Sequence, residues 1–236
     1  MITFDFKNTE ESLSIAWCDN GLVDGKFTEG LAHLVLYLGK SDLKLNEIFR
    51  VQGNQISRQR QIVFDHWIKN TTTDWLFWID SDVYVSIDNF KLLWNTAHKI
   101  EKPIVTGVYF VSKSTDYEVM QPLPVIFNNI DEKTIEYIHP LPENQVIEVD
   151  SSGMGFVLMH RSVGITLQNK FLNEPVFAEK LGLNNDFVGE DIAFFRKVKE
   201  AGIPIYAHTG ATAKHMKRFP LDINYYQAYW NIKKPE

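Results

Sequence analysis

The chain has 236 residues and a formal net charge of −6, with 24 Lys and Arg against 30 Asp and Glu. Its hydrophobic content of 44% and charged content of 23% are ordinary for a globular protein, which excludes a disordered or collagen-like chain. The weakly acidic balance also argues against nucleic acid as a partner. We therefore expect one folded domain over residues 1–236.

Three features that the sequence lacks narrow the class of protein further. Cys18 is the only cysteine, so the chain has no intrachain disulfide and no cysteine-based zinc site. No apolar run approaches the ~18 residues of a membrane helix. Residues 1–7 lack the basic and apolar regions of a signal peptide. From these observations we expect a soluble, intracellular protein without a transmembrane segment.

Strand-like and helical patterns alternate along the chain, as short apolar runs and apolar residues three and four apart. The expected strands are Leu13–Trp17, Glu47–Val51, Trp75–Ile79, Ile104–Phe110, Val146–Val149, Phe156–Met159 and Ile203–Ala207. The expected helices are Thr28–Leu38, Ile56–Ile68, Phe90–Ile100 and Glu190–Ala201, with Ser57 as a candidate cap of the second. This alternation predicts an α/β fold whose mostly parallel central sheet has helices on both faces.

The pattern loosens between residues 112 and 144, where four prolines interrupt it. We expect short strands there, in a β-ribbon or loop over the sheet. The tail from Phe219 onward is aromatic, and we expect it to pack back on the domain. No segment is rich enough in Gly, Ser or Pro to divide the chain into separate domains.

The segment Asp80-Ser81-Asp82 directly follows the apolar run Trp75–Ile79. In an open parallel sheet, ligands bind beyond the carboxyl ends of the strands. Two carboxylates two residues apart on an extended backbone point the same way, and a divalent cation between them would relieve their repulsion. A phosphate is the natural second partner of such a cation. The alternative is a solvated turn in which an Asp caps the next segment.

A second acidic segment, Gly189-Glu190-Asp191, opens the last expected helix. Carboxylates in a first helical turn can simply stabilise the helix by interacting with its dipole. They can also supply a general base at the edge of a site. We expect the helix terminus to hold the pKa of such a base low, so that it waits in the ionised form.

The densest basic segment is Lys214-His215-Met216-Lys217-Arg218, after the last expected strand. It is either a solvated surface run or an anion clamp in which His215 completes a metal site. Gly153 and Gly155 either let the backbone approach a ligand or serve a tight turn. Arg60, near the start of a helix, faces either a phosphate or the solvent.

Taken together and in this order, these segments resemble glycosyltransferases of the GT-A fold. The resemblance is to the large inverting, family-2-like group and its small phage- and bacterium-encoded relatives, and it covers about residues 12–218. The segments that carry it are Ser14–Trp17, Ile56–Val63, Trp75–Val83, Ile104–Tyr109, Val149–Phe156 and Gly189–Phe195, followed by His215.

The resemblance implies a Rossmann-like, nucleotide-diphospho-sugar transferase fold. It implies a nucleotide-binding part at about residues 12–110, an acceptor and catalytic part at about residues 111–218, and a tail at residues 219–236.

The resemblance also implies roles for single residues. Asp80 and Asp82 look like the family's Asp-x-Asp motif, which would hold Mn²⁺ or Mg²⁺ together with His215. Asp191 resembles the catalytic base, with Glu190 as its neighbour. The implied donor-binding residues are Asp19, Gln52, Arg60, Asp80, Ser81, Gly153 and Gly155.

The chain departs from the family pattern at three places. Gln61 stands where the family often has Asn after its Arg. Cys18-Asp19 replaces a more usual Pro-Thr after the first strand, and Gln52-Gly53 stand where an Asp often reads the base. All three departures concern contacts with the nucleotide.

The implied function is metal-dependent transfer of a sugar from a nucleotide-diphosphate donor, expected to be a UDP-sugar, to a hydroxyl of a carbohydrate or other acceptor, with inversion. The protein would then act in the cytoplasm, or in that of the host if a phage encodes it. Two alternatives stay open. A sugar-nucleotide nucleotidyltransferase needs a Gly-rich basic loop, of which Leu22–Lys26 supplies little. A non-catalytic module would bind carbohydrate or nucleotide without needing the acidic residues.

Overall fold

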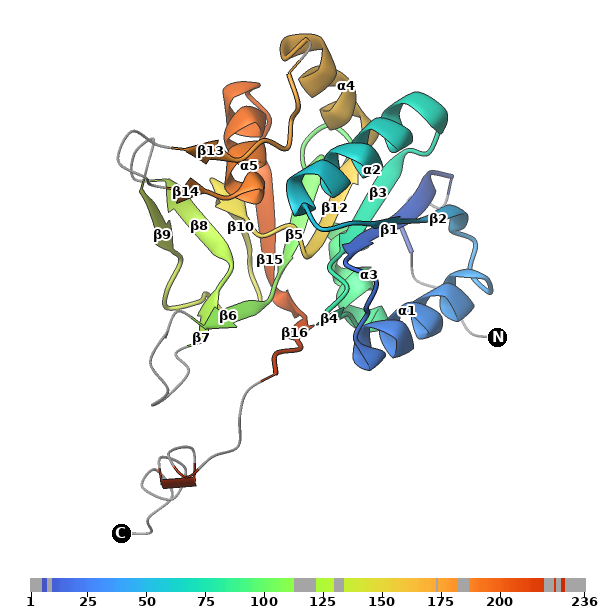
Figure 1. Ribbon diagram of the computed structural model, residues 1–236. Coiled ribbons are helices and arrows are strands. Elements are labelled where there is room, and N and C mark those ends of the chain that lie inside the picture. The colour runs from blue at the N-terminus through green and yellow to red at the C-terminus, as the bar shows by residue number, and fades with distance from the viewer. Residues whose placement is uncertain are drawn as a thin grey trace.

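The computed structural model describes Phe6, Lys7, residues 10–112, 122–129, 134–172, 174–181 and 187–218, together with Ile223, Tyr226 and Gln227. Its centre is a seven-stranded sheet of order β10-β15-β5-β12-β3-β1-β2 (Figure 1). These strands are β1 (Ser12–Asp19), β2 (Lys44–Gln52), β3 (Trp75–Ile79), β5 (Ile104–Val108), β10 (Val146–Val149), β12 (Phe156–His160) and β15 (Ile205–Thr212).

Five of the seven strands run in the same direction. Strand β12 is antiparallel to both β3 and β5, and β10 is antiparallel to β15, while the other neighbours are parallel. The five parallel strands therefore end at the same edge of the sheet. This arrangement confirms the predicted α/β fold with a mostly parallel central sheet.

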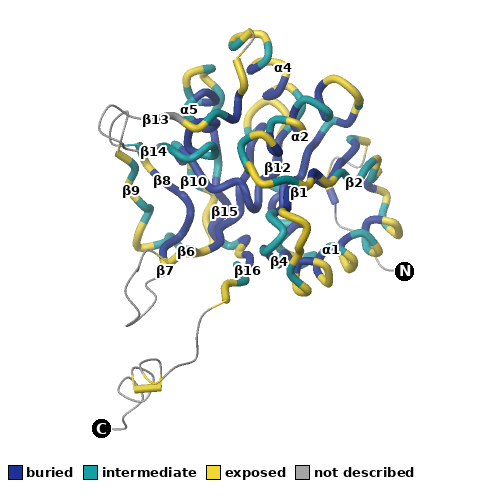
Figure 2. Tube along the Cα trace, in the orientation of Figure 1, coloured by how far each residue is buried: buried dark blue, intermediate teal, exposed yellow. Residues whose placement is uncertain are grey.

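Helices cover both faces of this sheet. On one face, α1 (Gly25–Leu38) and α3 (Ile87–Thr96) bury Leu34 and Phe90 in a cluster that includes Phe77 of β3. On the other face lie α2 (Ile56–Asn70), α4 (Arg161–Lys170) and α5 (Glu190–Glu200), which pack with Trp78. Because successive strand residues point to opposite faces, β3 is buried throughout (Figure 2). None of the helices in the described residues is long and apolar enough to cross a membrane.

Short strand pairs lie around the central sheet. Strand β4 (Val83–Tyr84) pairs with β16 (Lys214–His215), and β6 (Phe110–Ser112) pairs with β7 (Pro122–Pro124). A three-stranded sheet contains β8 (Ile126–Asn129), β9 (Ile135–Tyr137) and β11 (Ser151–Ser152). Strands β13 (Lys180–Leu181) and β14 (Phe187–Val188) form a further pair. The expected ribbon between residues 112 and 144 is thus confirmed for its described residues, whereas most of the tail from Phe219 lies outside them.

Several element ends differ from the predictions. Helix α2 follows Gln55, and Ser57 lies inside its first turn rather than capping it. Helix α3 begins earlier than expected because the Ser86 hydroxyl accepts a hydrogen bond from the Asn89 N–H at 3.2 Å. It also ends earlier, at Thr96, because Ala97 is extended. Helix α4 was not predicted, and β15 runs later along the chain than expected.

Gly107 of β5 tests how tightly β5 packs against the neighbouring strands β12 and β15. A Cβ atom at this position would lie 2.0 Å from a ring carbon of Phe156 and 2.8 Å from the Ala211 carbonyl oxygen. Gly107→Ala should therefore lower the free energy of unfolding by about 3 kcal/mol in denaturant titrations. Gly25→Ala is the control, because a Cβ there would meet no atom within 4 Å. Equal stability of the two variants would contradict this packing.

Candidate functional site

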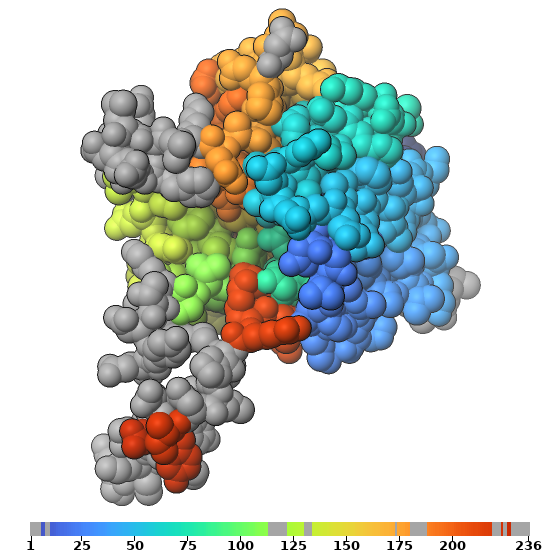
Figure 3. All heavy atoms as spheres, viewed as in Figure 1, coloured from blue at the N-terminus to red at the C-terminus, as the bar shows by residue number. Residues whose placement is uncertain are grey.

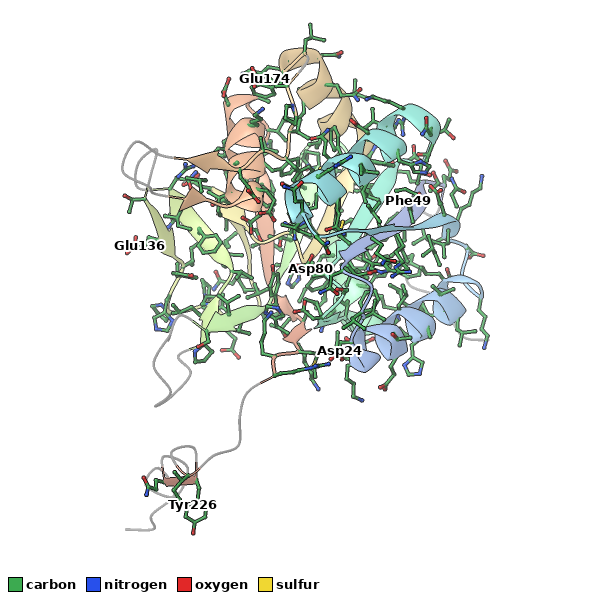
Figure 4. All side chains as sticks on the ribbon, in the orientation of Figure 1. Asp24, Phe49, Asp80, Glu136, Glu174 and Tyr226 are labelled. Atoms are coloured by element: carbon green, nitrogen blue, oxygen red, sulfur yellow. The ribbon has the colours of Figure 1, made fainter. Side chains whose placement is uncertain are left out.

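Charged and polar residues gather where the parallel strands end. Strand β1 ends at Asp19, β3 leads into Asp80, and β5 leads into Tyr109. Gly155, which precedes β12, reaches the same edge, because its carbonyl accepts a hydrogen bond from the Asp80 N–H at 3.1 Å. Figure 4 labels Asp80 near the middle of the molecule, at the end of β3. We therefore expect the ligand-binding site at the carboxyl edge of the sheet.

A buried guanidinium joins two of the predicted site residues. Arg60 of α2 has a side chain only 6% exposed. Its Nη2 donates to Asp80 Oδ1 at 3.0 Å, and its Nη1 donates to Glu190 Oε1 at 2.5 Å. Arg60 thus ties the end of β3 to the first residue of α5. Of the two interpretations of Arg60, exposure to solvent is excluded by this burial.

The charges in this cluster are strongly coupled. Burial alone would lower the pKa of Arg60, but the charges of Asp80, Glu190 and Asp191 raise it, so the guanidinium stays protonated. Burial raises the pKa of Glu190. Burial also raises the pKa of Asp191, although Arg60 and the Ile192 N–H oppose this rise. Our expectation that the helix terminus keeps the pKa of Asp191 low was therefore wrong, because loss of hydration outweighs the helix terminus.

The glycines before β12 allow close packing beside this cluster. A Cβ atom on Gly155 would lie 2.7 Å from Asp80 Oδ2, and one on Gly153 would lie 2.2 Å from the Tyr109 hydroxyl oxygen. That hydroxyl oxygen accepts a hydrogen bond from the Gly155 N–H at 3.2 Å. The tyrosine ring also packs edge-on against the His215 ring, with centroids 5.1 Å apart. Tyr109 ends one of the segments that carry the resemblance, but it was not predicted as a site residue.

A second charged cluster is built on Asp82. Strand β16 pairs with β4 so that His215 lies opposite Val83, which brings the imidazole to Asp82. His215 Nε2 lies 3.2 Å from Asp82 Oδ2, and Lys217 Nζ donates to the same oxygen at 2.8 Å. Burial alone would raise the pKa of Asp82, but hydrogen bonds from His215 and Lys217 lower it to about 2. This carboxylate is therefore ionised at neutral pH.

A hydrogen bond to the backbone carbonyl of Phe110 orients the imidazole of His215. Its Nδ1 lies 2.9 Å from the Phe110 carbonyl oxygen, which can only accept a hydrogen bond. Nδ1 therefore donates to this carbonyl, and Nε2–H donates to Asp82 Oδ2, so a divalent cation between the two side chains would take the place of the Nε2 proton. A backbone carbonyl commonly orients metal-binding histidines in this way. An ionised carboxylate and an oriented imidazole nitrogen together fit a divalent cation.

The structure separates the three predicted metal ligands. Asp82 and His215 lie together, but the carboxylate of Asp80 contacts Arg60 instead. The reason is local, because residues 80–82 form a turn, closed by the Val83 N–H and the Asp80 carbonyl at 3.0 Å. Our expectation that both carboxylates point the same way from an extended backbone was wrong. Over the described ranges, no group of three or more His, Cys, Asp and Glu side chains could hold a metal ion.

A cleft of about 740 Å³ connects the two clusters. The predicted site residues that line it are Asp19, Arg60, Asp80, Ser81 and Asp82. Lys217 and Arg218 line it as well, so a basic segment lies next to the acidic turn, with Lys217 bonded to Asp82. Figure 3 shows the red atoms at the end of this segment against blue atoms from the first part of the chain. Glu190 contacts the cleft lining through Arg60, and His215 contacts it through Asp82.

The carboxylate of Asp19 already accepts four hydrogen bonds from within the protein. Its oxygens accept hydrogen bonds from Arg50 Nε at 2.6 Å and Arg50 Nη2 at 2.7 Å. They also accept from the Trp17 ring nitrogen at 3.0 Å and the Gly21 N–H at 2.7 Å. Gln52 is exposed and accepts a hydrogen bond from the same Arg50. We did not expect Arg50, although its position two residues before Gln52 on a strand places both side chains on one face.

Replacing Arg60 with Met should leave the carboxylates of Asp80, Glu190 and Asp191 without their shared counter-charge. We expect Arg60→Met to lower the free energy of unfolding by about 3–5 kcal/mol at pH 7. The loss should be smaller at pH 5, because a carboxyl group whose pKa is raised in the folded state destabilises the fold only where it must ionise. Arg58→Met, on the exposed side of the same helix, is the control in denaturant titrations. Similar losses in both variants would contradict the role of Arg60.

Many solved structures are similar to this chain, although no family model and no curated protein match it. The A197 protein from STIV is 22% identical, with a TM-score of 0.55 over 88% of this chain and 86% of that one. GalNAc-T7, solved with UDP, GalNAc and Mn²⁺, is 10% identical, with a TM-score of 0.58 over 89% of this chain. The match covers 44% of GalNAc-T7, so this chain spans less than half of that protein. These likenesses confirm the predicted GT-A glycosyltransferase fold.

Proposed function

We propose that the protein is a metal-dependent glycosyltransferase that moves a sugar from a nucleotide-diphosphate donor, a UDP-sugar, to an acceptor hydroxyl with inversion. The observation that carries the proposal is the pairing of ionised Asp82 with the oriented imidazole of His215 beside a cleft with basic and acidic walls. The presence of UDP, GalNAc and Mn²⁺ in GalNAc-T7, which has a similar fold, supports it.

In this proposal Asp82 and His215 hold Mn²⁺ or Mg²⁺, and water and phosphate oxygens complete its coordination. The bound cation would stabilise the negative charge on the departing diphosphate. Lys217 now donates to Asp82, and its side chain is 52% exposed, so it is free to turn toward a phosphate. Asp80 is held by Arg60 and belongs to the sugar side of the donor site.

Asp191 is the better of the two candidate bases. Glu190 is bound to Arg60, and a carboxylate that pairs with a guanidinium is a poor proton acceptor. Burial raises the pKa of both carboxyl groups, so the choice of Asp191 rests on the ion pair that occupies Glu190. Asp191 would take the proton from the attacking acceptor hydroxyl, and Glu190 and Arg60 would hold the start of α5 in place.

We assign the nucleotide to the part of the chain at about residues 12–110, where most of the cleft lining lies. The acceptor and the base belong to the part at about residues 111–218. A non-catalytic binding module is the second candidate, since Asp19, Arg60 and Asp80 are all occupied by protein partners. Metal-dependent nucleotide binding without any transfer would favour that candidate.

The metal assignment is tested with Asp82→Asn and Asp82→Ala. Without the charge of Asp82, thermal stabilisation by UDP with Mn²⁺ should be lost, and release of nucleotide from a donor sugar should fall to background. Asp42→Asn, in an exposed position between α1 and β2, should keep both properties. Wild-type turnover by Asp82→Ala would remove this residue from the site.

The base assignment is tested with Asp191→Asn. We expect kcat to fall by about 100-fold or more while the Kd for UDP with Mn²⁺ stays unchanged. In the parent protein, kcat should fall as the pH drops through the raised pKa of Asp191, at higher pH than for an ordinary Asp. If transfer survives in Asp191→Asn but UDP binding fails, the residue binds the donor instead.

A further inference from the structure

A second cavity, of about 620 Å³, lies beside the candidate metal pair. Strand β16 forms one of its walls, and Figure 1 shows β16 between β4 and β6. Among the described residues, none lines both this cavity and the cleft. The lining includes Tyr84 of β4, Ser86 and Asn89 at the start of α3, Phe110 of β6, and Lys214 and His215 of β16. His215 therefore touches the cavity as well as Asp82 of the cleft.

Lys214 brings a positive charge to this cavity. Its Nζ lies 5.7 Å from the centroid of the Tyr84 ring. Within the described part of the chain, no carboxylate forms an ion pair with it, whereas Lys217 donates to Asp82 at 2.8 Å. The basic segment 214–218 is thus divided, with Lys217 at the cleft and Lys214 at the cavity. A cation that no carboxylate neutralises favours a ligand with a negative charge.

Two uncharged groups of the lining keep hydrogen-bonding capacity for a ligand. Ser86 Oγ accepts a hydrogen bond from the Asn89 N–H at 3.2 Å, which leaves its hydroxyl proton as a donor. Asn89 Nδ2 donates to the Thr212 carbonyl oxygen, so the orientation of the amide is set and Oδ1 remains an acceptor. Neither the Ser86 proton nor Asn89 Oδ1 has a partner among the residues that the structure describes. A sugar hydroxyl both donates and accepts, so it matches such a pair.

Aromatic rings supply the apolar part of the lining. The side chain of Phe110 is 38% exposed, and Tyr84 is half-buried. A ligand with an apolar face would cover the exposed ring and remove it from water. The carbon face of a sugar ring has this property, whereas inorganic phosphate does not. Because small-molecule sites combine apolar walls with a few polar groups, this lining fits a saccharide with an acidic group better than a bare anion.

We propose that this cavity binds a saccharide that carries a carboxylate or phosphate group, with Lys214 at the acidic group and the ring of Phe110 against the sugar. This saccharide is the part of the acceptor that lies away from the reacting hydroxyl, and that role rests on the proposed function. The two spaces are close, because His215 lines the cavity and the next residue, Met216, lines the cleft. An acceptor of more than one sugar would fill the cavity with one unit and present a hydroxyl at the cleft with another.

The test is calorimetry on the full chain at physiological salt, without nucleotide or metal, with ligand pairs that differ only in an acidic group. Digalacturonate is compared with galactobiose, cellobiouronate with cellobiose, and mannose 6-phosphate with mannose. We expect at least one acidic member to bind at least about tenfold more tightly than its neutral partner. The responding pair shows whether the acidic group is a carboxylate or a phosphate. Equal binding within every pair, or no binding at all, would overturn this inference and leave the proposed function intact. Saccharide binding by a protein that UDP with Mn²⁺ does not stabilise would keep this site and overturn the proposed function.

A variant pair assigns the charge to Lys214. Lys214→Met keeps the length of the side chain and removes its charge, so the acidic and neutral members should bind within about threefold of each other. Lys40→Met, at an exposed position that lines neither the cavity nor the cleft, removes the same charge and should keep the parent preference. An unchanged preference in Lys214→Met would overturn the assignment. If that variant does not fold, NMR spectra of the parent protein decide the question. The acidic saccharide should shift the amide signals of residues 84–89 and 110, and shifts confined to other residues would overturn the assignment.

Discussion

The ion pairs of Arg60 are the interaction on which the site depends. A buried cation is costly unless it is paired, and three carboxylates crowded together are costly unless a cation neutralises them. Arg60 resolves both problems, because it contacts Asp80 and Glu190 and lies close enough to Asp191 to shift its pKa. It therefore fixes where β3 ends relative to the start of α5. The position of the candidate base follows from an electrostatic constraint and not from the course of a surface loop.

The same constraint gives the two carboxylates of the Asp-x-Asp segment different partners. The turn at residues 80–82 sends Asp80 toward the buried guanidinium and Asp82 toward His215 and Lys217. Each carboxylate is neutralised by a different partner, which removes the repulsion that a shared direction would create. Arg60 is buried together with its ion pairs, whereas Lys217 is half-exposed and can exchange its partner for a ligand. This difference is what makes Asp82 the carboxylate that suits a cation.

The sequence predicted the fold well because buried strands and amphipathic helices leave a local pattern. The run Trp75–Ile79 matches β3 because each of its residues is covered from one face or the other. Helix α4 left no such pattern, since it buries little more than Val163, Gly164 and Leu167. Contacts in the site were harder to predict, because Arg60 and Glu190 are 130 positions apart and only the tertiary fold brings them together. The link between Asp82 and His215, which are 133 positions apart, was expected from their residue types and from the family resemblance.

The chemical character of the cleft lining changes along the order of the strands. Strands β2 and β1 lie at one end of the sheet, and their carboxyl ends carry the amide of Gln59 and the apolar residues nearby. Strand β3 comes next and supplies the acidic turn, while β5 and β15 lead to the segments that carry Tyr109 and His215. A nucleotide sugar has the same sequence of properties, from a flat base through charged phosphates to a sugar. If the base lies over β1 and β2, the phosphates reach Asp82 and Lys217, and the sugar carbon is left beside Asp80 and the start of α5. One direction of binding therefore satisfies the metal pair and the base assignment together.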